Sequence, residues 1–201
     1  MGFQFDPYTA ASLINMYFKC GSLCNAVQVF ENGTHSTAVA QDVTFWNSMI
    51  DGFFKNGLIK EGLFQFHRMQ SSGVSPDGYS LCILLRALDS NFGVRSGKEI
   101  HGYVVRKSFL YDTFVITALI DMYSNFGWPM GAWNVFERLQ DKNSSIVVWN
   151  AMINGFYENG WWNDSLELYT LVKNEGYKLV ASTLSTALAA CSHVRYLDFG
   201  G

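Results

Sequence analysis

Apolar residues recur along this chain at helical spacing, in pairs of stripes that a short polar break separates. The clearest first stripe consists of Trp46, Met49, Ile50, Phe53 and Phe54. Side chains three and four positions apart lie on one face of an α-helix, so this spacing predicts a helix with one buried face.

A second apolar stripe follows and predicts a second helix that runs back along the first. It contains Leu63, Phe66 and Met69, whereas Glu61, His67 and Arg68 are expected to face solvent. Asn56 and Gly57 lie between the stripes, and glycine is favoured just past a helix end because it accepts a positive φ. Gly73 and Pro76 close the unit, since proline cannot continue a helix. One such hairpin cannot bury both of its faces, so neighbouring hairpins must stack.

The hairpin pattern repeats along the chain. Residues 46–57 (WNSMIDGFFKNG) return as residues 149–160 (WNAMINGFYENG), an offset of 103 residues. Residues 12–17 and the pair Leu81 and Leu85 also have counterparts, in residues 118–123 and in Leu184 and Leu188. The unit is therefore about a third of that offset, roughly 35 residues in three alternating types, which is typical of a helical solenoid.

The unit Trp-Asn…Met-Ile…Gly…Asn-Gly…Leu…Met…Gly…Pro-Asp resembles a pentatricopeptide repeat. The three types resemble the standard, long and short repeats that alternate in plant organellar arrays. Residues 12–21 (SLINMYFKCG) are similar to the short type, and residues 97–101 (GKEIH) to an element of the long type. The resemblance covers essentially the whole chain. It implies an all-α fold, a right-handed α-solenoid of stacked antiparallel helical hairpins, with about five full repeats plus partial ends.

The repeats can be placed along the chain by their type. We expect the tail of a long-type repeat at 1–6, a short-type repeat at 7–42, a standard repeat at 43–77, a long-type repeat at 78–112, a second short-type repeat at 113–145, a second standard repeat at 146–180 and a truncated long-type repeat at 181–201. In the first short-type repeat, residues 32–37 (NGTHST) are predicted to form a polar loop after a helix near residues 25–30. Together the repeats form one solenoid domain.

The chain starts and stops inside repeats and lacks the polar capping elements of a complete solenoid. We therefore expect it to be part of a longer array. Its last helix would then expose the apolar face formed by Leu184, Leu188 and Cys191.

The composition fits a packed helical domain and argues against some classes of function. Apolar residues make up 49 % of the chain and charged residues 15 %, and the net charge is −3. This acidic balance argues against strong nonspecific nucleic-acid binding, which comes mostly from Lys and Arg at phosphates. We expect no membrane span, since no run of 18 apolar residues occurs, and no signal peptide is visible. The four cysteines form no Cys-x-x-Cys pair and are expected to be free and buried.

The sequence does not support an enzyme, and we expect no catalytic residue, metal site or cofactor. Its four histidines are scattered, and none stands at a metal-ligand spacing from another. His101 is expected to pack or cap within its hairpin. Some relatives carry a zinc deaminase domain with His-x-Glu and Pro-Cys-x-x-Cys signatures, and neither signature occurs here.

The resemblance instead implies RNA binding, with one base read per repeat by the fifth and last residues. In the first standard repeat these are Asn47 and Asp77, which look like the family's uracil-preferring pair. Thr44 and Tyr79 would then sandwich the base. The alternative for Asn47 is a helix N-cap, a position that asparagine favours because its side chain accepts hydrogen bonds from free backbone N–H groups.

The other repeats match this code less well. Asn150 fits a pyrimidine preference, but its partner Val180 cannot form hydrogen bonds. Thr117 resembles a purine-preferring residue, and its partner is either Ser145 or Asn143. The sandwiching positions in these repeats are Phe114 and Val147. The pair Ala11 and Asp42 lacks a donor at the fifth position, and Cys82 with Asp112 belongs to the long type, whose code is poorly defined.

Our leading hypothesis is a module that binds single-stranded organellar RNA by sequence, together with editing or processing factors. The resemblance implies a role in cytidine-to-uridine editing-site choice, splicing or transcript stabilisation, in a mitochondrion or chloroplast. The alternative is a protein-interaction scaffold, as in tetratricopeptide arrays of similar helices, which the acidic balance favours slightly. A third hypothesis is a degenerate product without a function of its own.

Overall fold

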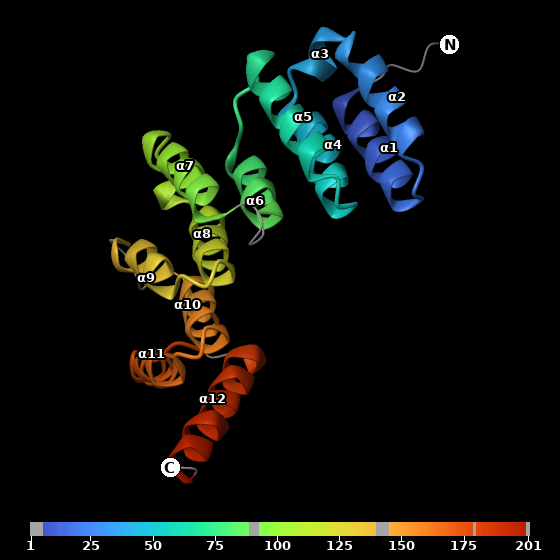
Figure 1. The fold of residues 1–201 in the computed structure, drawn as a ribbon. Coiled ribbons are helices and arrows are strands. Elements are labelled where there is room, and N and C mark those ends of the chain that lie inside the picture. The colour runs from blue at the N-terminus through green and yellow to red at the C-terminus, as the bar shows by residue number, and fades with distance from the viewer. Residues whose placement is uncertain (1–5, 89–92, 140–144, 179, 200–201) are drawn as a thin grey trace. The chain divides into compact units, whose positions relative to one another are not determined.

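The computed structural model of this chain describes residues 6–88, 93–139, 145–178 and 180–199. Within these residues every regular element is a helix (Figure 1). None of the described helices is long and apolar enough to cross a membrane. The chain divides into two compact units, residues 1–87 and 88–201.

The first unit consists of two helical hairpins and two further helices, the short α3 and α6. Its helices are α1 (Pro7–Lys19), α2 (Leu23–Thr34), α3 (Thr37–Ala40), α4 (Val43–Lys55), α5 (Ile59–Ser71) and α6 (Gly78–Ala87). Helix α1 packs against α2 and α4 against α5, and α1, α4 and α6 contact one another in that order. The first helices of successive repeats therefore form one continuous layer in this unit.

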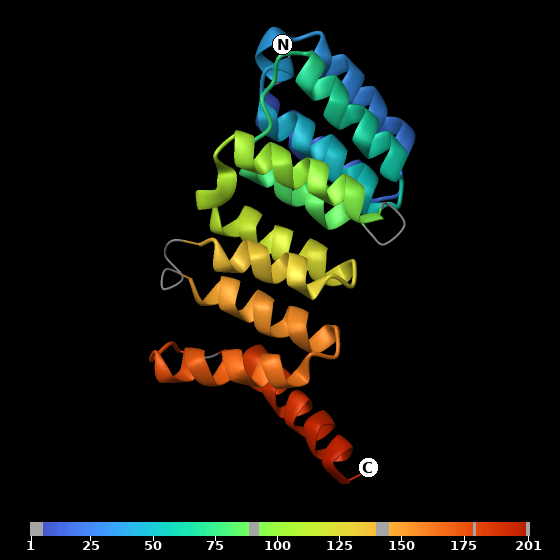
Figure 2. The ribbon, with the colours of Figure 1, turned by 60° about the vertical axis from the view of Figure 1, so that its left-hand side comes forward.

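The second unit repeats this arrangement, as the successive helices in Figure 2 show. Its elements are α7 (Gly93–Arg106), the 3₁₀ helix η1 (Phe109–Tyr111), α8 (Thr113–Asn125), α9 (Pro129–Glu137), α10 (Ile146–Glu158), α11 (Trp162–Asn174) and α12 (Ala181–Phe199). Helix α8 pairs with α9 and α10 with α11, while α8, α10 and α12 contact one another in series. The predicted architecture of stacked helical hairpins is thus confirmed.

Local chemistry fixes where the helices of the hairpin α4–α5 begin and end. The Asp42 side chain accepts hydrogen bonds from the backbone N–H groups of Thr44 and Phe45 and so caps the start of α4. Gly57 ends the helix with a φ of +73°, which a residue with a Cβ adopts only under strain. The predicted Asn-Gly break between the two helices is therefore confirmed.

Aromatic side chains fill the core of the first unit. Phe30 of α2 stacks on Phe45 of α4, with ring centroids 4.7 Å apart, and meets Trp46 edge to face at 5.0 Å. All three side chains are fully or almost fully buried. Trp46 also satisfies its polar group, since Nε1 donates to the carbonyl of Ala40 at 2.8 Å.

The polar loop predicted at residues 32–37 is mostly wrong. Residues 32–34 are helical and belong to α2, and residues 37–40 form α3, so the expected polar loop is mostly helix. Gly33 is buried there, and a Cβ added to it would lie 2.6 Å from the Phe45 ring. Helix α2 therefore continues through Gly33, which packs against Phe45, although the polar sequence of this segment predicted a loop.

Arg68 does not simply face solvent, as its sequence position suggested. Its Nη1 and Nη2 donate to both carboxylate oxygens of Glu31, at 2.5 and 2.9 Å. The guanidinium carbon also lies 5.6 Å from the Phe30 ring centroid and 5.9 Å from that of Trp46. The arginine links α5 to α2 because its flat cation can pair with a carboxylate and lie over aromatic rings at once.

This ion pair makes a testable prediction about pH. The hydrogen bonds from Arg68 lower the pKa of Glu31, so the pair stabilises the fold above the unfolded pKa of about 4.3. That contribution disappears as the pH falls through the lowered pKa of the folded state. We expect Glu31→Gln to reduce the free energy of unfolding by about 0.5–1 kcal/mol at pH 7, because the pair is partly exposed.

Urea unfolding at pH 7, 5 and 3.5 measures this effect, and the difference from wild type should shrink at the lowest pH. Glu99→Gln is the matched control, since Glu99 pairs with Arg95 at 3.5 Å in an almost fully exposed position. Equal effects of the two substitutions at pH 7 would contradict the role of the Arg68 contact.

The end of the described chain differs from its internal counterpart. Helix α12 runs on to Phe199, whereas its counterpart α6 ends at Ala87, and Leu88 after it is not helical. Leu184 and Leu188 are 46 % and 63 % exposed and Cys191 is also exposed, as expected for this face. None of the four cysteines forms a disulfide, and the expectation that they are buried is correct only for Cys82, because Cys20, Cys24 and Cys191 are exposed.

Candidate functional site

A polar cavity in the first unit brings together the residues that the repeat code singled out there. It has a volume of about 290 Å³ and lies where α1, α4 and the start of α6 meet. Its lining residues are Asn15, Thr44, Asn47, Ser48, Asp51, Asp77 and Tyr79. All four residues predicted for this repeat, Thr44, Asn47, Asp77 and Tyr79, are therefore at one site.

Asn47 is held in the wall of this cavity by two partners. Its Nδ2 donates to Asp77 Oδ1 at 3.2 Å, and its Oδ1 accepts from the Ser80 hydroxyl at 2.6 Å. The Asn47 side chain is only 2 % exposed, so the network fixes its position. An ionised carboxylate can only accept hydrogen bonds, so Asp77 sets which end of the amide faces it.

This orientation leaves a defined capacity for a ligand. One Nδ2 hydrogen of Asn47 is used by Asp77, and the Oδ1 is used by Ser80. The second Nδ2 hydrogen has no partner among the described residues, and the amide carries two such hydrogens. Asn47 therefore keeps one Nδ2 hydrogen that can be donated to a ligand, while its Oδ1 retains a second lone pair beyond the one that Ser80 uses.

Asp77 also has a structural role, because it caps α6. Its Oδ1 accepts from the Ser80 backbone N–H at 2.8 Å, in the manner of an N-cap side chain. Asp112 and Ser145, the last residues of two other predicted repeats, cap α8 and α10 in the same way. The last residue of a repeat thus caps the first helix of the next repeat.

The N-cap interpretation of Asn47 is wrong. Helix α4 begins at Val43 and its cap is Asp42, so Asn47 lies inside the helix, more than one turn from its start. Asn47 instead contacts Asp77, the last residue of its own predicted repeat. Its burial and its two long-range hydrogen bonds are not those of a capping residue.

Thr44 and Tyr79 line the same cavity nearer to solvent. Both are exposed, and the Tyr79 side chain is 56 % exposed although it is aromatic. Asp51 forms an ion pair with Lys55 at 2.5 Å, and this hydrogen bond raises the pKa of Lys55.

The equivalent position in the second unit is built differently. Asn150 lies in α10, and its Oδ1 accepts from the Thr183 hydroxyl at 2.7 Å. Val180 stands where Asp77 stands in the first unit, and it is 45 % exposed. A hydroxyl can donate or accept, so without a carboxylate the orientation of the Asn150 amide is not fixed.

The remaining predicted residues of the second unit are less tightly linked. The Thr117 hydroxyl donates to the Thr113 carbonyl of its own helix at 2.7 Å, and Ser145 accepts from the Val147 N–H at 3.3 Å. Asn143, the other candidate partner of Thr117, lies outside the described residues. Phe114 and Val147 are 74 % and 48 % exposed, at the second positions of α8 and α10.

Two positions that match the repeat code poorly are buried. Ala11 in α1 and Cys82 in α6 are 8 % and 4 % exposed. His101 packs as expected, but against the next hairpin: its Nδ1 lies 3.0 Å from the Tyr123 hydroxyl of α8. Burial lowers the pKa of His101, and the charge of Arg138 adds to this. Among the described residues, no group of three or more His, Cys, Asp or Glu side chains could hold a metal ion.

The residues that sequence reasoning missed are Ser80 and Thr183. Each lies 33 positions after the asparagine to which its hydroxyl donates. The 103-residue offset relates both the two asparagines and the two hydroxyl residues, so the sequence did contain a signal for this pair.

The repeats match known repeat families over much of the chain. Residues 41–89 match the PPR repeat family, and residues 114–144 and 147–177 each match the PPR repeat. A pentatricopeptide repeat-containing protein of Arabidopsis thaliana is 48 % identical over the whole chain, which covers 24 % of that protein. Mitochondrial and chloroplastic proteins of the same description from this plant are 36 % and 32 % identical, with 28 % and 22 % of their lengths covered.

Solved structures show the same fold. The crystal structure of the pentatricopeptide repeat protein PPR10 from maize matches 94 % of this chain with a TM-score of 0.72 and 18 % identity, over 27 % of its own length. PPR10 in complex with an 18-nt psaJ RNA element matches 92 % of the chain with the same TM-score. The predicted solenoid fold is thereby confirmed, and the chain spans about a quarter of the length of these proteins.

Proposed function

Because this chain belongs to the pentatricopeptide repeat family, whose repeats are binding elements and not catalytic ones, we propose that it binds single-stranded RNA and reads individual bases along its first-helix layers. The observation that carries this proposal is the cavity of the first unit. There Asn47, fixed by Asp77 and Ser80, offers a donor beside two exposed side chains, Thr44 and Tyr79.

The geometry supports a preference for uracil at this repeat. Uracil presents the O4 carbonyl acceptor where cytosine presents an amino donor, as thymine and cytosine do in DNA. The free Nδ2 hydrogen of Asn47 can donate to O4, whereas it would face hydrogens on the cytosine amino group. Tyr79 would stack on the base, since aromatic side chains bind unstacked bases through their faces.

Electrostatics support reading of bases more than attraction to phosphates. The chain carries 14 Lys and Arg against 17 Asp and Glu, and Asp51 and Asp77 both line the cavity. The chain then has few Lys and Arg side chains to neutralise RNA phosphates, so its affinity for RNA should depend only weakly on salt concentration. This property distinguishes the proposed module from a basic, nonspecific RNA-binding surface.

We further propose that the RNA is organellar and that the chain contributes to transcript processing, such as choice of an editing site, splicing or stabilisation, alongside other processing factors. The relatives named mitochondrial or chloroplastic support this setting, as does the predicted alternation of standard, long and short repeats. PPR10 in complex with its RNA element supports the class of ligand.

A titration with short labelled RNAs tests the proposal. We expect the chain to bind an RNA of about ten nucleotides that carries uracil at the position read by Asn47 in preference to the same RNA with cytosine there. Doubling the salt concentration should change the affinity only severalfold, which follows from few phosphate contacts. Failure of the folded chain to bind any member of a randomised RNA pool would refute RNA binding and favour a protein-interaction scaffold.

A further inference from the structure

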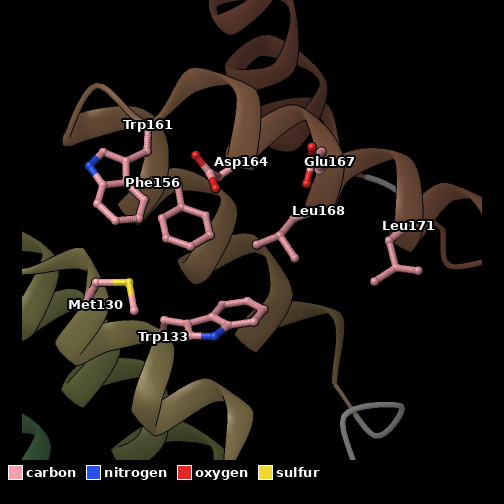
Figure 3. Close-up of a pocket in the computed structure, with 8 residues that line it drawn as sticks. All are labelled: Met130, Trp133, Phe156, Trp161, Asp164, Glu167, Leu168 and Leu171. Atoms are coloured by element: carbon pink, nitrogen blue, oxygen red, sulfur yellow. The ribbon is translucent and has the colours of Figure 1, made fainter.

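A second hollow lies in the second unit, between the second helices α9 and α11, with Phe156 of α10 in its lining. We call it the α9–α11 groove. It has a volume of about 470 Å³, within the range of about 300–1,000 Å³ for ligand pockets. Its lining residues, drawn in Figure 3, are Met130, Trp133, Phe156, Trp161, Asp164, Glu167, Leu168 and Leu171.

The groove is apolar, and its floor is already ordered. Trp133, Phe156 and Trp161 form a continuous row of rings, with centroid separations of 5.8 Å and then 5.5 Å. Met130 and Leu171 are 44 % and 45 % exposed although they are large apolar side chains. A partner that covered these side chains would gain from their burial without reorganising the rings.

Two carboxylates border this apolar floor. Asp164 and Glu167 project from α11 beside the groove (Figure 3). Within the described part of the chain, neither carboxylate belongs to an ion pair. With Leu168 and Leu171 they follow the spacing i, i+3, i+4 and i+7, so one face of α11 carries both charge and apolar surface over about 10 Å.

The equivalent place in the first unit is not an apolar groove, so the groove is a feature of the second unit and not of every repeat. There Arg68 of α5 pairs with Glu31 of α2 and links the second helices of two hairpins. By the internal repeat, Arg68 corresponds to Leu171, and Glu31 corresponds to Glu137. Leucine cannot form the ion pair, and in the second unit this place is apolar and accessible.

We propose that the α9–α11 groove binds an amphipathic helix of a partner protein, with apolar side chains on the ring floor and Lys or Arg along the edge beside Asp164 and Glu167. A helix is favoured because the described elements offer no sheet edge, so the partner must satisfy its own backbone hydrogen bonds. The two carboxylates favour a basic partner and disfavour RNA, whose phosphates they would repel. This surface is independent of the cavity at Asn47.

Fluorescence anisotropy with designed peptides tests this proposal on the whole chain. The probe is a crosslinked helical peptide with leucines at i, i+3, i+4 and i+7 and lysines on the adjoining edge. Its twin carries glutamates in place of the lysines. We expect the lysine peptide to bind about tenfold or more tightly than the twin, because like charges oppose binding.

Variants of the chain locate the peptide. Asp164→Lys with Glu167→Lys should reverse the preference, and Leu171→Arg should weaken binding of the lysine peptide about tenfold by adding a positive charge at the groove. Glu61→Lys is the matched control, since Glu61 is the exposed counterpart of Asp164 on α5, and it should leave binding unchanged. The four substituted residues are exposed, and circular dichroism of each variant checks that it folds.

Two results would overturn the proposal. They are absence of lysine-peptide binding to the folded chain and equal binding of both peptides. Because the RNA titration reads the cavity at Asn47, the two proposals can fail separately.

Discussion

Replacing Asn47 with alanine is expected to reduce the preference for uracil over cytosine at the base read by this repeat by about tenfold or more. A well-placed polar contact discriminates between bases by about 1–3 kcal/mol, and 1.4 kcal/mol corresponds to a factor of ten. Alanine removes the Nδ2 donor that Asp77 and Ser80 hold toward the cavity. The measurement is a pair of RNA titrations, with uracil or cytosine at that position and all other bases constant.

The effect should depend on how firmly the amide is oriented. Asn150→Ala is the matched control, because Asn150 has Thr183 as a partner but Val180 in place of a carboxylate. Its loss should change uracil preference much less at its own base. Ser80→Ala should have an intermediate effect, since Asp77 still holds the amide nitrogen of Asn47.

Two outcomes would contradict this mechanism. One is an unchanged preference for uracil in Asn47→Ala. The other is an equal loss of preference in Asn150→Ala, which would mean that the carboxylate of Asp77 does not matter. Unfolding curves must accompany both titrations, because Asn47 is buried and the variant could also lose stability.

The second large effect is expected from Gly52→Ala, which should lower the free energy of unfolding by about 1–2 kcal/mol. Gly52 lies where α4 contacts α1, and a Cβ there would come within 2.1 Å of Cδ2 of Phe18. The ring must then leave its buried site, and burial of a phenylalanine contributes about 1.5–3 kcal/mol. The better helix propensity of alanine returns up to about 1 kcal/mol, which is less than this loss.

Gly102→Ala provides the control for propensity alone. Gly102 lies inside α7, and the nearest side-chain atom to an added Cβ is Nη1 of the flexible Arg106, at 3.2 Å. We expect this substitution to stabilise the chain by about 0.5–1 kcal/mol. Urea unfolding compares the two variants. If both stabilised the chain alike, the close approach of α1 and α4 at Gly52 would be wrong.

Phe18→Leu tests the cause of the Gly52 effect. The smaller, more flexible side chain should tolerate the added Cβ better than a ring does. The double variant should therefore be more stable than the sum of the single changes indicates. Strict additivity would show that Phe18 is not the obstacle.

The sequence predicted most of the local structure because local structure follows from residues close together in the chain. The apolar spacing of Trp46, Met49 and Ile50 gave a buried helix face, and these three side chains are buried in α4. Gly57 ends that helix as its place after Asn56 indicated. The grouping of Thr44, Asn47, Asp77 and Tyr79 was anticipated through the repeat code, and they share one cavity.

Predictions failed where a side chain meets a neighbour that is distant in sequence. Arg68 was expected in solvent, yet it reaches Glu31, 37 residues earlier, and lies over buried rings. Residues 32–34 were expected in a loop, yet Phe45 packs against Gly33 and the helix continues. Asn47 was a plausible N-cap by residue type, yet Asp42 already caps the helix.

The sequence by itself determined that this chain is a series of paired helices, because hydrophobic period, helix caps and the 103-residue repeat are all written along the chain. Only the tertiary structure decided that Ser80 and Asp77 fix the Asn47 amide, and that Leu171 leaves an apolar groove where Arg68 forms an ion pair. These features depend on distances between helices of different hairpins. A periodic pattern reports which face of a helix is buried, but not which atoms meet it there.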